Sequence, residues 1–451
     1  MDPLAFRRAR IVLVAVLFWA ILFVAVRPAR AQGLPLIRDT EIENLLNDYA
    51  RPIFKAAGLG EGRISIRIVR SDIFNAFVLD GRNVFIHTGA LMQSDTPNQV
   101  IGVIAHESGH IAGGHLAALR ARIARDQTRS LLISVLGLGV AIATGQGAAV
   151  FAGQELVMRS LLAERRSQES AADQAGLRFL NATHQSGRGM LETFEKFAQQ
   201  EYISDKQKDP FVRSHPVAAD RMAQLRELVQ HSPSYDAKDP PQLQLRHDMM
   251  RAKLSGYLER PQVVFNRYPV SDNSLPARYG RAIAKFMQGG PDGLPTALVE
   301  VESLVRERPD NPHFWELKGD LMIRSGHSRD AIAPLRQALK LSGEASLIRV
   351  QLASALLATN DPGVVSEAID LLRRSLVDEQ NQRAYRALAD AYYRQGKQAD
   401  ADAAIAQAYF LEGDVKQAQV FAQRAQRALR QGSPAWIKMD DIINYKPPNE
   451  S

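Results

Sequence analysis

The stretch His106-Glu107-Ser108-Gly109-His110 decides the fold and chemistry expected for the first half of the chain. Apolar residues precede it, and a helix is expected from about 98 to 125. Because positions i and i+4 share one helix face, both imidazoles can bind one zinc ion. Glu107 lies beside them and can take a proton from the attacking water. The alternative, a surface helix with incidental histidines, does not explain the apolar setting.

A third zinc ligand is expected from a second helix. Catalytic zinc sites commonly use three protein ligands, and a chain without cysteine must supply them from His, Asp and Glu. The segment from Glu169 to Asp173 places two carboxylates four residues apart among small residues. Glu169 is the candidate ligand, and Asp173 can accept a hydrogen bond from a ligand imidazole. Such a spacing alone is usual on solvated helix faces, so the interpretation depends on the histidine pair.

One further histidine, His215 in Ser214-His215-Pro216, is a candidate for the same site, with Arg221 shortly after it. Three roles are open for His215: a fourth ligand that displaces water, a donor to the oxyanion, or a loop histidine without a catalytic role. Arg221 is expected to support the site indirectly. His115 stands at i+5 from His110, off the expected metal face, and is interpreted as structural.

Composition limits the other classes of function. The chain has 451 residues, with 45% hydrophobic and 23% charged residues, which is typical of globular domains. The absence of cysteine excludes disulfides, cysteine-linked lipid anchors and cysteine nucleophiles. Residues 1–31 carry four of the seven net positive charges. The remaining +3 gives no basic footprint, so no nucleic-acid partner is expected.

The beginning of the sequence resembles a secretory signal. Three arginines precede an uncharged apolar run over residues 11–26, and the small-x-small triplet Ala29-Arg30-Ala31 follows. This pattern predicts a signal peptide over residues 1–31, cleaved near Ala31. The alternative is an uncleaved amino-terminal anchor. Both place the rest of the chain outside the cytoplasm, which in a bacterium means the periplasm.

Residues 32–231 are expected to form an α+β, zincin-like metallopeptidase domain. Residues 63–70 alternate between polar and apolar side chains, as in a half-buried strand. Two further short strands are expected at 75–79 and 83–87, joined by a hairpin at Asp80-Gly81. The segment Asn75-Ala76-Phe77 is the candidate substrate-binding strand, because an extended peptide can pair with the edge of a sheet.

The second half is expected to be an all-α solenoid of tetratricopeptide repeats over residues 275–445, after a linker and connecting helix at 232–274. The signature spacing of small and large residues occurs at Trp315, Gly319, Met322, Gly326, Ala331, Leu335 and Ala338. It recurs at Tyr385, Ala389, Tyr392, Gly396, Ala401, Ile405 and Ala408. Such stacks bind peptides or partner proteins. An irregular helical bundle is the alternative.

Residues 130–154 form a stretch without charged side chains that is long enough to cross a bilayer. It contains several glycines, and a single crossing would separate His110 from Glu169. A buried turn or an apolar lid over the active site is therefore the preferred interpretation. Peripheral membrane contact and partner binding are the alternatives.

Taken together, these motifs resemble the gluzincin peptidase family that contains the CaaX prenyl protease and the heat-shock protease HtpX. The resemblance covers residues 40–225 by motif and 275–430 by architecture. A signal peptide with carboxy-terminal repeats is similar to the soluble, periplasmic branch of that family. The resemblance implies one zinc per chain bound by His106, His110 and Glu169. It also implies Glu107 as catalytic base and His215 as a regulatory or transition-state residue.

The expected function is that of a periplasmic zinc endopeptidase. By the resemblance, its substrates are unfolded or misassembled outer-membrane β-barrel proteins, and its repeats contact the β-barrel assembly machinery. Its role is then quality control, through degradation and chaperone-like assistance. The alternative is a latent protease that acts mainly as a repeat-based chaperone or scaffold. A repeat adaptor with a purely structural metal site is disfavoured, because such a site needs no base like Glu107.

Overall fold

The computed structural model describes residues 34–60, 62–118, 120–121, 148–198, 211–212 and 215–447, without the side chains of 148–162. The predicted signal peptide and Ser214 lie outside the described residues. Of the predicted lid at 130–154, only the backbone of the last seven residues is described, as the start of a helix.

A small mixed sheet forms the centre of the first half. Its order is β1 (Leu36–Ile37), β2 (Ser65–Val69), β4 (Asn83–His87) and β3 (Ala76–Val78). The neighbours β2 and β4 are parallel, whereas β1 and β3 pair antiparallel at the two edges. Three strands and the hairpin between β3 and β4 are confirmed. The two-residue strand β1 is additional, because it is too short to give an alternating pattern in the sequence.

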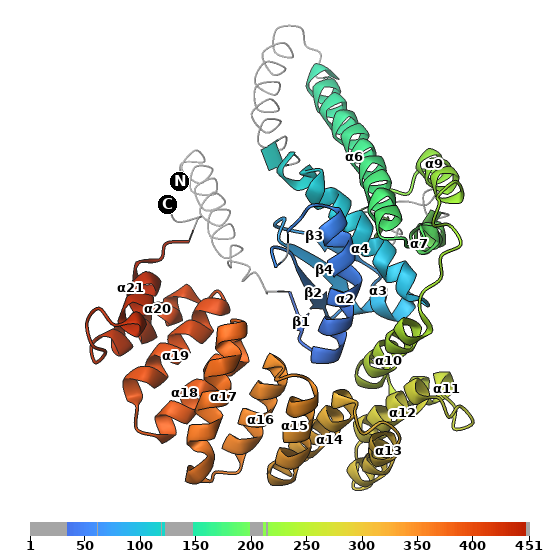
Figure 1. Ribbon diagram of the computed structural model, residues 1–451. Helices are drawn as coiled ribbons and strands as arrows, with labels where there is room; N and C mark the ends of the chain where they lie inside the picture. Colours follow the sequence, from blue (N-terminus) through green and yellow to red (C-terminus); the bar gives the residue numbers. More distant parts are fainter. Residues whose placement is uncertain are drawn as a thin grey trace, which may run out of the picture. The chain divides into compact units, whose positions relative to one another are not determined.

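One face of this sheet packs against helices (Figure 1). The buried strand residues on that face are Ile66, Ile68, Ala76, Val84 and Ile86. They join the apolar side of α2 (Thr40–Ala56) and the start of α4 (Pro97–Ala112) in one core. The short helix α3 (Thr88–Gln93) connects β4 to α4. The sheet therefore holds α4, which carries the histidine motif, directly against β3.

Helices α6 (Ala148–Ala182) and α7 (Arg188–Ala198) pack against α4, and α9 (Ala219–Gln230) packs against α6 and α7. The expectation of one continuous helix from 98 to 125 is wrong. Helix α4 ends at Ala112, and Gly114 has φ +63°, a left-handed conformation that stops an α-helix. Helical backbone resumes at His115.

Every described element after α9 is helical. The connecting segment holds α10 (Pro241–Leu258) and α11 (Pro261–Arg267). The following helices are α12 (Leu275–Gln288), α13 (Gly293–Glu307), α14 (Pro312–Arg324), α15 (Ser328–Leu341), α16 (Ser346–Ala358), the 3₁₀ turn η2 (Pro362–Val364), α17 (Val365–Asp378), α18 (Gln382–Arg394), α19 (Gln398–Leu411), α20 (Val415–Gln426) and α21 (Pro434–Asn444).

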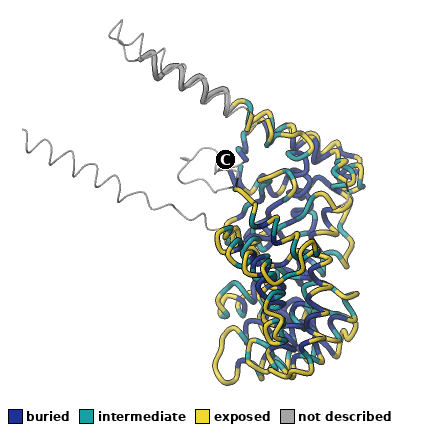
Figure 2. Tube along the Cα trace, turned by 90° about the vertical axis from the view of Figure 1, so that its left-hand side faces the viewer, coloured by how far each residue is buried: buried dark blue, intermediate teal, exposed yellow. Residues whose placement is uncertain are grey.

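Each helix of this region packs against the next, and small buried residues lie at the contacts. Ala331, Leu335 and Ala338 of α15 are buried, as are Ala401 and Ala408 of α19, at the positions that the repeat pattern predicts. Figure 2 shows buried residues running along the inside of the described chain. The predicted fold class, an α+β domain followed by an all-α stack of paired helices, is confirmed.

Helix α10 belongs to both regions. Its Met250 and Leu254 join the core of the first half, whereas Met249 joins the core of the first repeat helices. The buried ammonium of Lys253 lies 2.8 Å from Asp39 Oδ2 and 3.1 Å from Glu41 Oε2, at the start of α2. The first half and the helical half are therefore joined by packing as well as by chain connectivity.

Hydropathy adds one finding about membranes. Among the residues that the structure describes, no helix combines the length and the apolar character that a bilayer span requires.

Candidate metal centre

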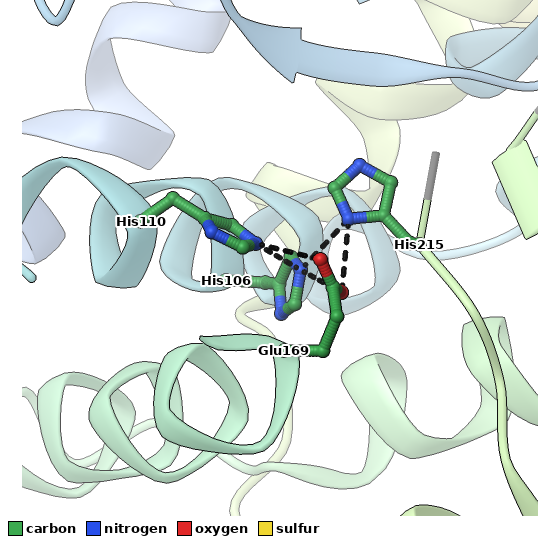
Figure 3. Close-up of side chains that lie close together, drawn as sticks. All are labelled: His106, His110, Glu169 and His215. Atoms are coloured by element: carbon green, nitrogen blue, oxygen red, sulfur yellow. Dashed lines mark hydrogen bonds and ion pairs between the residues drawn. The ribbon is translucent and has the colours of Figure 1, made fainter. Parts of the chain in front are cut away.

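Four side chains from three segments converge beneath the edge strand β3. They are His106 and His110 of α4, Glu169 of α6, and His215, which precedes α9. Each offers one ligand atom, and these atoms all lie within 4.8 Å of one another (Figure 3). Histidine nitrogens with one carboxylate are a donor set that zinc prefers in proteins.

The facing atoms of the cluster are identified by its short contacts. His106 Nε2 lies 3.1 Å from His110 Nε2 and 3.2 Å from His215 Nδ1. The carboxylate of Glu169 lies 3.4 Å from both Nε2 atoms and 3.1 Å from His215 Nδ1. So Nε2 of each motif histidine and Nδ1 of His215 point toward a common centre.

Asp173 and Arg221 make hydrogen bonds and ion pairs to the residues of the cluster. His106 Nδ1 donates to Asp173 Oδ1 at 2.9 Å, so that Nε2, which points to the centre, is the atom left to bind a metal. The guanidinium of Arg221 donates to both oxygens of Asp173, at 2.5 and 2.8 Å, and lies 3.1 Å from Glu169 Oε2. It also donates to the carbonyl of Pro216 at 2.8 Å, which anchors the segment that carries His215.

These buried charges shift the proton affinities of the cluster. Burial alone lowers the pKa of His106, but hydrogen bonds to Asp173 and Glu169 outweigh it and raise the pKa to about 9. Burial raises the pKa of Glu169, and the neighbouring histidines more than reverse this, so the carboxyl is ionised. The pKa of Asp173 is likewise lowered, because Arg221 outweighs burial. In the absence of a metal, the cluster therefore holds a proton that a metal ion would replace.

The buried side chain of Glu107 lies next to the cluster. Its side chain is 1% exposed, and its Oε1 has no hydrogen-bond partner in the described part of the chain. His215 Nε2 lies 3.5 Å from Glu107 Oε1. A buried carboxylate oxygen without a partner is costly unless a water or substrate group completes it. The donor set fits a metal ion, and the buried Glu107 oxygen without a partner fits a water or substrate group beside it.

Residues Asn75, Ala76 and Phe77 lie at the edge strand above the cluster. The carbonyl of Asn75 accepts from His87 N at 2.9 Å, and Phe77 stacks on Phe85 with ring centroids 5.2 Å apart. In an antiparallel pair, bonded and non-bonded residue pairs alternate, so the backbone groups of Ala76 face the free edge. There His215 Nε2 donates to the carbonyl of Ala76 at 3.2 Å.

His115 contacts the cluster from its outer side, which the sequence interpretation missed. Its Nδ1 lies 3.0 Å from His110 Nδ1, on the side of the ring opposite the converging atoms. His115 lies off the metal face, as its i+5 spacing predicts, and it is not one of the converging ligands. Its contact with His110 was not predicted, because the end of α4 at Ala112 redirects the chain before His115. The pair Gly113-Gly114 is the sequence signal for this break.

Close packing between α4 and α6 brings Glu169 to the histidines. A Cβ on Gly109 would lie 2.6 Å from the carbonyl oxygen of Ala172, so only glycine permits this approach. The small residues between Glu169 and Asp173 serve the same contact, since Ala172 is fully buried. Glu169 and Asp173, four residues apart on one face of α6, thereby both reach His106 of α4 and Arg221 of α9.

Comparison with known proteins gives a family match over the first half of the chain and relatives that span most of its length. Residues 37–229 match the model of peptidase family M48. The β-barrel assembly-enhancing protease of Yersinia pestis is 23% identical over 443 residues, covering 93% of this chain and 86% of that protein. The protein of the same name from Escherichia coli (strain K12) is 25% identical over 426 residues, covering 91% and 84%.

The predicted relationship is thus confirmed, and it extends across both halves of the chain. Among solved structures, MamA MSR-1 C2 aligns with 39% of this chain and 99% of its own length, at 20% identity and a TM-score of 0.31.

Proposed function

We propose that this chain is a periplasmic zinc metalloendopeptidase that acts on unfolded or misassembled outer-membrane β-barrel proteins. The observation that carries the proposal is the convergence of His106, His110 and Glu169, with Glu107 beside them, whose buried Oε1 has no hydrogen-bond partner among the described residues. The full-length similarity to proteins named β-barrel assembly-enhancing protease supports the substrate class.

His106, His110 and Glu169 would hold one zinc ion per chain. Zinc, when bound, supplies a Lewis acid that polarises the scissile carbonyl and lowers the pKa of water. Glu107 takes the proton from the attacking water and delivers it to the leaving amine. Asp173 and Arg221 orient His106 and Glu169, so that these ligands do not need to rearrange during the reaction.

Substrate would lie extended along β3, with its backbone paired to the outward groups of Ala76. Phe77 and Asn75 flank this position and contact the substrate side chains. The helical repeats would recruit the substrate or the β-barrel assembly machinery that delivers it. Residues 1–31 would direct export and be removed near Ala31.

His215 would act as a resting latch. Its Nδ1 faces the metal position, and its Nε2 donates to the carbonyl of Ala76, which an arriving peptide needs. A fourth protein ligand fills a tetrahedral zinc site and excludes water. Pairing of a peptide with β3 would compete for the Ala76 carbonyl and release His215, which ties activation to substrate arrival.

This latch also supports the second candidate function, a scaffold whose protease is mostly latent. One experiment separates the two. Purified full-length protein, loaded with zinc, is incubated with an unfolded outer-membrane β-barrel protein, and fragments and aggregates are measured. The enzyme produces fragments, loses this activity to a chelator and regains it with zinc. Suppressed aggregation without fragments, unchanged by the chelator, contradicts the enzyme and leaves the scaffold.

A further inference from the structure

His110 is held differently from its partner His106. Its Nε2 faces the other ligands, at 3.1 Å from His106 Nε2 and 3.4 Å from Glu169 Oε1. Its Nδ1 lies 3.0 Å from His115 Nδ1, with the two rings nearly perpendicular at 80°. Each motif histidine thus turns Nε2 to the centre and has its Nδ1 engaged by a side chain, Asp173 for His106 and His115 for His110.

We propose that His115 is a positioning residue that fixes His110 in its metal-binding orientation and tautomer. An imidazole that binds a metal through Nε2 carries its proton on Nδ1, and that N–H needs an acceptor. His115 Nδ1 is that acceptor, and its own proton then resides on Nε2. The proposal rests on the zinc site proposed above and adds a residue from outside the motif.

The backbone around His115 is shaped for this contact. Gly114 has φ +63°, which turns the chain after α4 and brings the next residue back beside the preceding turn. At Gly113, a Cβ would lie 2.4 Å from His115 Nε2, so any other residue would meet the ring. The two glycines therefore perform separate tasks: one reverses the chain and the other leaves room for the imidazole.

The residues that contact Nδ1 of His106 and Nδ1 of His110 differ in charge. Asp173 is anionic and bound to Arg221, whereas His115 is a neutral acceptor on the more open side of the site. A neutral partner orients His110 without adding negative charge to a centre that already includes Glu169 and Glu107. Partners of this kind typically contribute about 10–100-fold to metal affinity.

Two substitutions in the full-length chain test the hydrogen bond itself. His115→Phe keeps a flat ring but removes the acceptor, whereas His115→Asn places an amide oxygen close to the position of Nδ1. Exposed His231→Phe is the matched control. The measurements are the zinc dissociation constant by chelator competition, the visible spectrum of the cobalt-substituted protein, and the melting temperature without metal.

The expected result is a zinc affinity about 10–100-fold weaker in His115→Phe, with a changed cobalt spectrum and an unaltered melting temperature. His115→Asn should restore both properties toward wild type. Gly113→Ala, which leaves His115 in place but crowds its ring, should behave like His115→Phe.

Two outcomes would overturn the role of His115. One is wild-type zinc affinity and an unchanged cobalt spectrum in His115→Phe. The other is equal loss in the Phe and Asn variants, which would mean that packing and not the acceptor matters. Both presuppose that the wild-type chain binds zinc; failure of the wild type to do so would instead refute the proposed function.

Discussion

His215 Nε2 lies 3.2 Å from the carbonyl oxygen of Ala76, which joins the candidate metal centre to the edge strand of the sheet. The Ala76 carbonyl faces away from β4, because its neighbour Asn75 makes the hydrogen bond to His87. His215 therefore occupies a backbone site that an extended peptide would use. The ring of His215 therefore contacts both the other candidate ligands and the carbonyl of the edge strand.

Removal of this ring should activate the enzyme. We expect His215→Ala to raise basal cleavage of an unfolded protein, including cleavage of its own chain, because water gains access to the metal. The alternative role of His215, stabilisation of the oxyanion, predicts a loss of about a hundredfold or more. Rates are compared at matched zinc content, and a clear decrease would eliminate the latch.

Pairing of substrate with β3 can be tested at Val78, whose N–H faces the same free edge as that of Ala76. Val78→Pro removes this donor, and proline is tolerated on an edge strand. We expect kcat/KM for an unfolded substrate to fall about 3–10-fold, the equivalent of one lost hydrogen bond. The control Val78→Thr keeps the N–H and the β-branch. Equal rates in the two variants would contradict edge pairing.

Zinc uptake should release a proton near neutral pH. In the metal-free chain the pKa of His106 is about 9, above its usual 6.5. Its proton therefore stabilises the metal-free fold fully below pH 6.5, and this contribution is lost as pH rises through about 9. Zinc replaces that proton, so its affinity should rise with pH up to about 9.

Calorimetry in two buffers with different ionisation enthalpies measures the number of protons released at pH 7.5. About one is expected, falling toward zero at pH 10, where His106 is already neutral. Release of no proton at pH 7.5 would show that His106 is unprotonated before zinc binds.

The junction between the two halves should depend on Lys253. Its buried ammonium pairs with Asp39 and Glu41, so Lys253→Met leaves two carboxylates partly buried without their cation. We expect the free energy of unfolding to fall by about 3 kcal/mol, measured by denaturant titration. Exposed Lys238→Met is the control. Equal stability of the two variants would mean that this ion pair contributes nothing to the junction.

Contacts between residues that are close in the sequence are predictable from the sequence alone. His106 and His110 share a face through helical spacing alone, and the alternation in β2 follows from the period of a strand. The repeat helices are equally predictable, because each signature residue packs within its own helix pair. The partnership of Glu169 with the histidine pair came from chemistry and family resemblance, since its spacing is common on helices.

Contacts between distant segments are much less predictable. The bond from His215 to Ala76 joins residues 139 positions apart, and it depends on how the edge of the sheet lies above α4. His115 lies off the metal face, as its spacing predicts, but its contact with His110 was not predicted, because it depends on the turn at Gly113-Gly114. The bridge from α10 to the first half through Lys253 had no local signature either.

The most direct test of peptide hydrolysis at this site compares zinc-loaded Glu107→Gln with wild type on an unfolded outer-membrane β-barrel protein. Glu107 lies beside the ligands and is not one of them, so the variant should bind zinc with wild-type affinity. Its cleavage rate should fall by about 10²–10⁴-fold, because the residue that moves the proton is gone. Glu195→Gln, on the surface of α7, should cleave normally. Full proteolysis by zinc-loaded Glu107→Gln would contradict peptide hydrolysis at this site.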